Sequence, residues 1–84
     1  EPDAPEWLLA PNPTTGRLSM QAEFEKESLL QLYDRTGKLV RSWNLGALYG
    51  PTNLDLGVLP DGMYLLRWMR PDGESSKRVV VLKK

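Results

Sequence analysis

The side chains that most often carry out covalent and metal chemistry are missing, because the sequence contains no cysteine and no histidine. Their absence excludes Ser-His-Asp and Cys-His nucleophile systems, zinc sites with nitrogen or sulfur ligands, and disulfide bonds. Carboxylates remain, and the turn aspartates are Asp34, Asp55, Asp61 and Asp72. Such residues could bind calcium, but no segment has the dense, alternating acidic spacing of a calcium loop. We therefore expect them to bond their own backbone, and we expect no metal site and no cofactor.

The aromatic residues are the second set of candidates for a binding site. The chain has three tryptophans, three tyrosines and one phenylalanine. Several exposed rings could form a sugar-stacking platform or a protein-binding hot spot. With a single phenylalanine available, however, most of the tryptophans and tyrosines are needed to fill the core. We expect one or two rings at the surface, and Tyr49 first among them, because it lies in the glycine-containing stretch Gly46–Pro51.

The charged residues give no sign of a strongly charged partner. Lys plus Arg total 11 and Asp plus Glu total 11, so the formal net charge is zero. A neutral domain without a basic stripe has no general attraction for nucleic acid or for an anionic membrane. Glu23, Glu25 and Glu27 alternate, which is typical of the solvated face of a strand. The basic residues near the end, typical of a solvated and protected sheet edge, are Lys77, Arg78, Lys83 and Lys84.

The length of 84 residues predicts one domain, which leaves little room for a deep catalytic cleft. Residues 1–6 are acidic, contain two prolines and are expected to be a linker, so the domain comprises residues 7–84. No apolar run approaches the roughly 20 residues of a membrane-spanning helix, and no signal peptide is visible. Because the chain starts without Met on a linker-like segment, we expect a domain from the end of a longer protein.

Alternating apolar residues and Gly/Pro turns predict strands throughout the chain. Met63–Arg70 is apolar on both faces and should be central in its sheet. The inward set of Lys38–Leu45 stays open between Val40 and the pair Leu39 and Trp43, and Gly46–Pro51 is expected to be a loop. Seven short strands of this kind predict an all-β fold, an immunoglobulin-like antiparallel β-sandwich. The expected strands are Trp7–Ala10, Leu18–Phe24, Ser28–Tyr33, Lys38–Leu45, Thr52–Leu56, Met63–Arg70 and Ser76–Lys84.

Four segments occur in an order that resembles a known family. They are Pro11–Gly16 (PNPTTG), Leu32–Val40 (LYDRTGKLV), Asp55–Arg67 (DLGVLPDGMYLLR) and the basic, valine-rich Lys77–Lys84. Each segment alone contains only residues that are common in turns and strands. Together, however, the segments occur in the family's order, with suitable spacing, and the match covers Leu9 to Lys84. In this respect the sequence resembles the C-terminal sorting domain of the bacterial type IX secretion system. One departure is Trp68, which is bulkier than the small aliphatic residue that the family pattern leads us to expect.

The resemblance implies a specific function. Such domains end large proteins of the Bacteroidetes group that cross the inner membrane by an N-terminal signal peptide. The folded domain is recognised in the periplasm by the outer-membrane translocon and a β-barrel shuttle protein. A sortase at the cell surface, itself a cysteine peptidase, cuts upstream of the domain and can join the cargo to anionic lipopolysaccharide. The domain would thus be a removable signal on a surface or secreted cargo protein, and not an enzyme.

A second hypothesis is an immunoglobulin-like accessory domain that binds carbohydrate or protein. For the sorting hypothesis, Pro11 and Pro13 would hold a rigid turn, Asn12 would bond to the backbone, and Gly16 would adopt a positive φ. A rigid turn lowers the ordering cost of binding, although the same residues could serve only to turn the chain. The terminal strand could add to a partner sheet or be held through its lysines. The candidate recognition residues are Pro11, Asn12, Pro13, Gly16, Asp34, Gly37, Gly62, Lys83 and Lys84.

Overall fold

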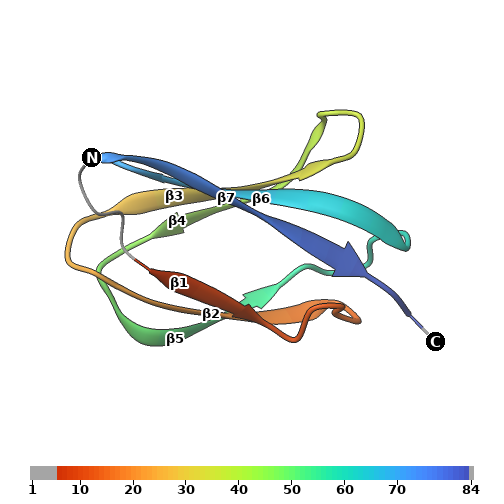
Figure 1. The fold of residues 1–84 in the computed structure, drawn as a ribbon, viewed down its shortest axis with the longest axis horizontal. Helices are drawn as coiled ribbons and strands as arrows, with labels where there is room; N and C mark the ends of the chain where they lie inside the picture. Colours follow the sequence, from red (N-terminus) through yellow and green to blue (C-terminus); the bar gives the residue numbers. More distant parts are fainter. Residues whose placement is uncertain (1–5, 84) are drawn as a thin grey trace.

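The computed structural model describes residues 6–83, which form seven strands and no helix. Figure 1 shows the strands stacked as two layers, with the last residues at one end of the molecule. Of the predicted linker, only Glu6 lies within the described residues. In chain order, the strands are β1 (Trp7–Ala10), β2 (Arg17–Phe24), β3 (Ser28–Asp34), β4 (Leu39–Leu45), β5 (Leu48–Asp55), β6 (Gly62–Arg70) and β7 (Gly73–Val81).

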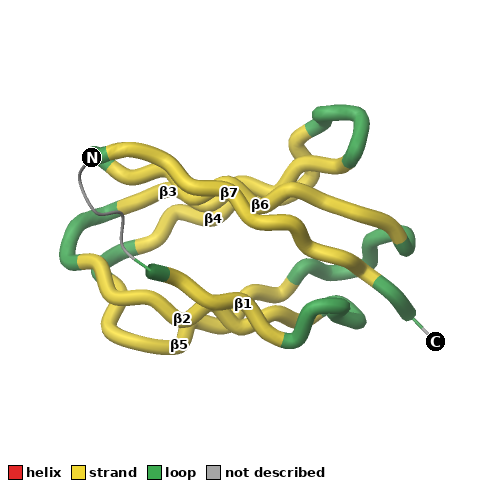
Figure 2. The backbone as a smooth tube through the Cα atoms, viewed as in Figure 1, coloured by secondary structure: helices red, strands yellow, loops and turns green. Residues whose placement is uncertain are grey.

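The strands form two antiparallel sheets that face each other across the core (Figure 2). One sheet has the order β1-β2-β5 and the other the order β4-β3-β6-β7. The predicted immunoglobulin-like sandwich is therefore confirmed. Because β6 lies between β3 and β7, its predicted central position is also confirmed. β7 is an edge strand as expected, and β1 is an edge strand of the other sheet.

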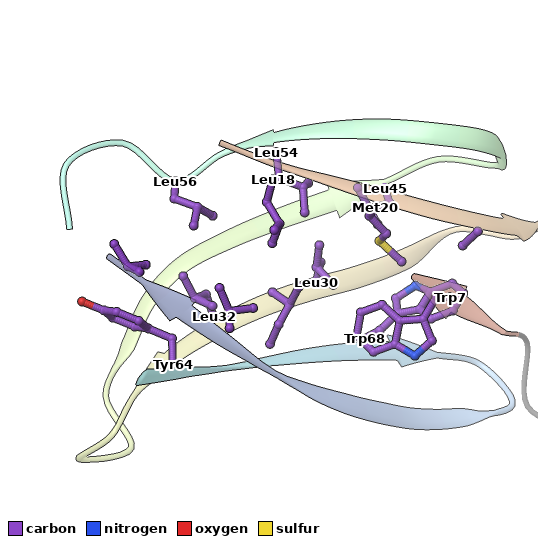
Figure 3. Packing of buried hydrophobic residues seen from close by; sticks show 14 of the residues in the cluster. Trp7, Leu18, Met20, Leu30, Leu32, Leu45, Leu54, Leu56, Tyr64 and Trp68 are labelled. Carbon is purple, nitrogen blue, oxygen red and sulfur yellow. The ribbon is translucent and has the colours of Figure 1, made fainter. Parts of the chain in front are cut away.

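The core forms because side chains alternate along each strand and one face of each sheet is apolar. In β2, the residues Leu18, Met20 and Ala22 are buried and point toward the other sheet. Leu30 and Leu32 of β3 are fully buried on the opposite side of the core. Figure 3 shows the leucines and the methionine among these side chains filling the space between the two layers.

Aromatic rings close the core at its two ends (Figure 3). Trp68 is fully buried, with its ring centroid 5.4 Å from that of Trp7 and 5.7 Å from that of Phe24. Its indole Nε1 donates a hydrogen bond of 2.9 Å to Ser28 Oγ, so the bulky residue noted in the sequence is accommodated with its polar atom paired. At the other end lies Tyr64, whose ring is also buried.

The prediction of a loop at Gly46–Pro51 is wrong from Leu48 onward, because β5 begins there. Glycine and proline suggested a break, but β5 pairs only with β2 and is an edge strand, where both residues are tolerated. The alternation continues through the segment: Leu48 is buried and Tyr49 is 77% exposed. Tyr49 is therefore at the surface as predicted, although on a strand.

A bulge explains why the inward set of β4 could not be chosen from the sequence. The register between β3 and β4 shifts between Leu32 and Tyr33 and leaves Val40 without a partner. An extra residue in one strand changes which side chains face the core. Val40 and Trp43 both pack against the core, whereas Leu39 is exposed, so neither alternative is right as stated.

Candidate functional site

The PNPTTG turn, which comprises residues 11–16, connects β1 to β2 and lies along the free edge of β7. Both peptide bonds that precede Pro11 and Pro13 are cis. The side chain of Asn12 donates from Nδ2 to the carbonyl of Arg78 at 3.0 Å and accepts from the amide of Val80 at 2.9 Å. The sequence predicted that Asn12 bonds to the backbone, and the structure shows that this backbone belongs to β7, and not to the turn.

The main chain of Thr14 continues the same contact. Its amide donates to the carbonyl of Val80 at 2.8 Å, and its carbonyl accepts from the amide of Leu82 at 2.9 Å. Thr14 and Val81 thereby form an isolated parallel bridge. Asn12 and Thr14 together bond both backbone groups of Val80 that point away from β6: Asn12 accepts from the amide, and Thr14 donates to the carbonyl. The expectation that the terminal strand could add to a partner sheet is therefore wrong at Val80 while the turn is in place.

The side chain of Thr14 fixes the shape of the turn itself. It is fully buried, and its Oγ1 donates to the carbonyl of Arg17 and accepts from the amide of Gly16. Gly16 has a φ of 141°, a positive value as predicted, and its carbonyl accepts from the amide of Leu56 at 2.9 Å. Sequence reasoning missed Thr14. A threonine two residues before a glycine is typical of a side-chain turn, but its burial depends on β7.

The start of β6 lies beside this region. Gly62 pairs with Val81, and the carboxylate of Asp61 accepts a hydrogen bond of 3.1 Å from the amide of Lys83. Gly62 has a φ of 157°, which is close to the extended conformation. The side chain of Lys83 is exposed, and Lys84 lies outside the described residues.

Asp34 and Gly37 occur in a second turn, the β3–β4 hairpin. The amide of Gly37 donates to the carbonyl of Asp34 at 3.0 Å, so the four residues form a turn with Asp first and Gly last, and Asp34 lies in a turn as expected. Gly37 has a φ of 89°, in the left-handed region that favours glycine. One carboxylate oxygen of Asp34 accepts from the amide and the hydroxyl of Thr36 and from the amide of Lys38.

The electrostatics of this hairpin follow from those three bonds. The hydroxyl of Thr36, and then the amide of Lys38, hold the pKa of the Asp34 carboxyl below its ordinary value, because both donate to its charged form. The carboxylate is therefore occupied within its own turn.

The structure places the candidates at one end of the sandwich but in two groups. The PNPTTG turn, Gly62 and Lys83 form a continuous region around the end of β7. The β3–β4 hairpin with Asp34 and Gly37 projects separately at the same end (Figure 1). Within residues 6–83, no three carboxylates lie close enough together to hold a metal ion. The same residues include no helix that is long and apolar enough to cross a membrane.

The chain was compared with models of known protein families. The sequence model of a family described as the secretion system C-terminal sorting domain matches residues 9–82. No curated protein matches the chain. The matched range contains the PNPTTG turn, the β3–β4 hairpin and the start of β6, and so it includes every candidate residue except Lys83 and Lys84. The chain therefore belongs to the family of C-terminal sorting domains of the type IX secretion system.

Proposed function

We propose that this domain directs a larger cargo protein, joined to its N-terminus, through the periplasm and across the outer membrane. The domain is recognised in its folded form by the shuttle β-barrel of the type IX system. A sortase then removes it, and it has no catalytic role of its own. The family assignment supports the general part of this proposal, since type IX sorting tails direct export to the cell surface or to secretion.

The observation that supports recognition of the folded form is the contact between the PNPTTG turn and β7. Asn12 bonds to residues 66 and 68 positions later in the chain. The side chains of Pro11, Asn12 and Pro13 are exposed beside the end of β7. A receptor that contacts the turn and β7 together finds this surface only in a folded domain, and a surface held in this way loses little entropy on binding.

The accessory-domain hypothesis has less support. Of the aromatic side chains in residues 6–83, Tyr49 is the one that is strongly exposed, while Trp7, Tyr64 and Trp68 are buried. A sugar-stacking platform needs broad exposed aromatic area, and a single tyrosine supplies little of it.

The proposed cleavage lies upstream of β1. Trp7 is the first residue of that strand, and its side chain is buried against Trp68. A protease needs an extended and accessible backbone, so a cut within β1 would require local unfolding. We propose that the sortase cuts in or before residues 1–6.

A fusion experiment tests this function. The 84-residue chain is joined to the C-terminus of a reporter protein that carries a signal peptide, in a bacterium with a working type IX system. A matched fusion carries Leu66→Asp, which places a charge at a fully buried core position and should unfold the domain. The reporter should reach the surface or the medium with the unmodified tail and stay in the periplasm with Leu66→Asp. Mass spectrometry of the delivered reporter should give a new C-terminus upstream of Trp7.

Two results would contradict parts of the proposal. A reporter that stays in the periplasm with the unmodified tail would contradict the sorting function. Equal delivery with the Leu66→Asp tail would show that the machinery recognises linear sequence and not the fold. The same fusions in a strain without the translocon control for leakage.

A further inference from the structure

Several apolar side chains are exposed on the outer face of the four-stranded sheet. Side chains of β6 alternate, so Tyr64 and Leu66 point into the core while Met63 and Leu65 point outward. Met63 is 50% exposed and Leu65 is 38% exposed. The register places Leu65 beside Tyr33 of β3, so apolar side chains of neighbouring strands adjoin on this face.

The matching face of the other sheet also has exposed apolar side chains, at Leu8 of β1 and Tyr49 of β5, but they do not pair with each other in the register. The outward-facing residues of β2 and β5 are mostly polar or charged, and they include Gln21, Glu23, Asn53 and Asp55. A polar outer face is the ordinary state of a solvated sheet. The four-stranded sheet differs in that apolar side chains of adjacent strands adjoin on its outer face, at the exposed Leu65 and the half-buried Tyr33.

This face is also hollowed, next to the β3–β4 hairpin. A groove of about 400 Å³ is present there, and we call it the outer-face groove. Apolar side chains and arginines line it together; the main ones are Tyr33, Met63, Leu65, Arg35, Arg67 and Arg78.

Positive charge is concentrated at the outer-face groove although the whole chain is neutral. Arg67 lies over the ring of Tyr33, with its guanidinium carbon 5.2 Å from the ring centroid. Within residues 6–83, the single ion pair joins Arg70 and Asp72, so no carboxylate of this part of the chain pairs with the arginines of the groove. The carboxylate that does line the groove, that of Asp34, has an oxygen occupied by the bonds of its own turn.

We propose that the outer-face groove is a docking site for a segment of a partner protein that carries apolar side chains next to carboxylates. The apolar side chains would cover Met63 and Leu65, and the carboxylates would pair with Arg35, Arg67 or Arg78. Arginine is suited to this role because its planar guanidinium can bind a carboxylate through two hydrogen bonds. That the partner belongs to the export machinery rests on the proposed function, whereas its chemistry follows from the groove alone.

A peptide titration tests the chemistry directly. The probe is the capped peptide Ser-Leu-Asp-Leu-Asp-Ser, added to the isotope-labelled 84-residue chain and followed by NMR. Shifts should be confined to residues around Leu65, with none at Gln21 on the opposite sheet. The control peptide Ser-Leu-Asn-Leu-Asn-Ser should bind about tenfold more weakly, and added salt should weaken only the aspartate peptide. Equal binding of both peptides, or shifts spread over both sheets, would overturn the proposal.

Charge reversal in the fused tail tests the site in cells. Arg35→Glu with Arg78→Glu reverses two exposed charges at the groove, and Arg17→Glu with Lys26→Glu makes the same change in net charge elsewhere. Thermal unfolding of each chain confirms that it is folded. Surface delivery should fall about tenfold or more for the groove pair and stay unchanged for the control pair. For the apolar part, Leu65→Ser should reduce delivery, while Leu8→Ser, at an exposed leucine of the other sheet, should not.

The results separate this proposal from the sorting function. Normal delivery of the folded groove pair, or an equal loss for both charge pairs, would overturn the docking site and leave the sorting function intact. If the unmodified fusion is not delivered, the proposed sorting function is contradicted. The peptide titration then tests by itself whether the outer-face groove is a docking site.

Discussion

Two turns of this domain each contain a threonine and end in a glycine, but they make different contacts. The β3–β4 hairpin keeps its turn bonds within five residues, from Asp34 to Lys38. The PNPTTG turn instead bonds to β7, through Asn12 and Thr14, across more than sixty positions of sequence. The first turn reverses the chain locally, whereas the second joins the beginning of the domain to its end.

The difference teaches that turn chemistry in a sequence reveals where a chain bends but not what the bend contacts. Damage to the hairpin should stay local. Substitutions in the PNPTTG turn should also destabilise β7, and through its pairing with β7 they should destabilise β6. Substitutions can break or sharpen this contrast, and the largest effect is expected at a residue that supports both regions.

Truncation of the Tyr64 side chain should weaken both regions alike, because β6 pairs with β3, which leads into the hairpin, and with β7, which the PNPTTG turn contacts. The backbone of Tyr64 is opposite Asp34 of β3 and Val79 of β7, and its ring is buried in the core. Loss of a buried aromatic ring costs about 3–5 kcal/mol. Tyr64→Ala should therefore lower the free energy of unfolding by this amount and reduce export of a fused cargo. Denaturant unfolding and a surface assay measure the two effects.

The phenylalanine variant of the same residue is the control. Tyr64 donates from its hydroxyl to the carbonyl of Pro60 at 2.7 Å, and Tyr64→Phe removes only this bond. The loss should be about 0.5–1.5 kcal/mol. If both variants lost the same stability, packing of the ring would not be the main contribution.

Thr14→Val should affect the PNPTTG turn and its contact with β7 but not the β3–β4 hairpin. Valine keeps the shape of threonine but leaves the carbonyl of Arg17 and the amide of Gly16 without their partner, at a cost of about 1–3 kcal/mol. The amides of Val80 and Leu82 should exchange hydrogen faster, while those of the hairpin should not change. Thr15→Val, at an exposed neighbour, is the matched control and should have little effect on either. Unchanged exchange at Val80 in Thr14→Val would show that the two parts of the contact are independent.

Asp34→Asn should have the smallest effect, and it should depend on pH. The folded state lowers the pKa of Asp34, so its carboxylate stabilises the fold above the unfolded pKa of about 3.9. That contribution is lost as the pH falls through the lower pKa of the folded state. The parent chain should therefore be more stable than Asp34→Asn at pH 7, with the difference shrinking as the pH is lowered below about 4. Urea unfolding at pH 7 and pH 3 measures this, and a difference that grows toward pH 3 would contradict the expected direction of the pH dependence.

The sequence was sufficient for features that depend on near neighbours. The alternation of Leu18, Met20 and Ala22 located β2, and Asp34 with Gly37 located the hairpin. It was insufficient where position in the sheet decides the outcome. Gly50 and Pro51 suggest a loop unless β5 is known to be an edge strand, and the inward side of β4 depends on a bulge opposite β3.

The candidate site shows the same division. Asn12 was identified as a residue that bonds to the backbone, but its partner 66 positions away could not be found from turn chemistry. Thr14 was missed because only contact with β7 buries it. The outer-face groove was also missed. Its apolar residues alternate like those of any central strand, and its arginines come from three separate segments of the chain.

The bond between the PNPTTG turn and β7 has a consequence for the biogenesis of the domain. A ribosome makes the turn early and the segment from Arg78 to Leu82 last, so the fold cannot close until nearly the whole domain has been synthesised. Contacts of such high sequence separation also slow folding. A chain that terminates before β7 lacks a partner for β6 and for the turn alike. Under the proposed function, export would then act as a check on completeness, because cargo from an interrupted translation would carry no folded tail.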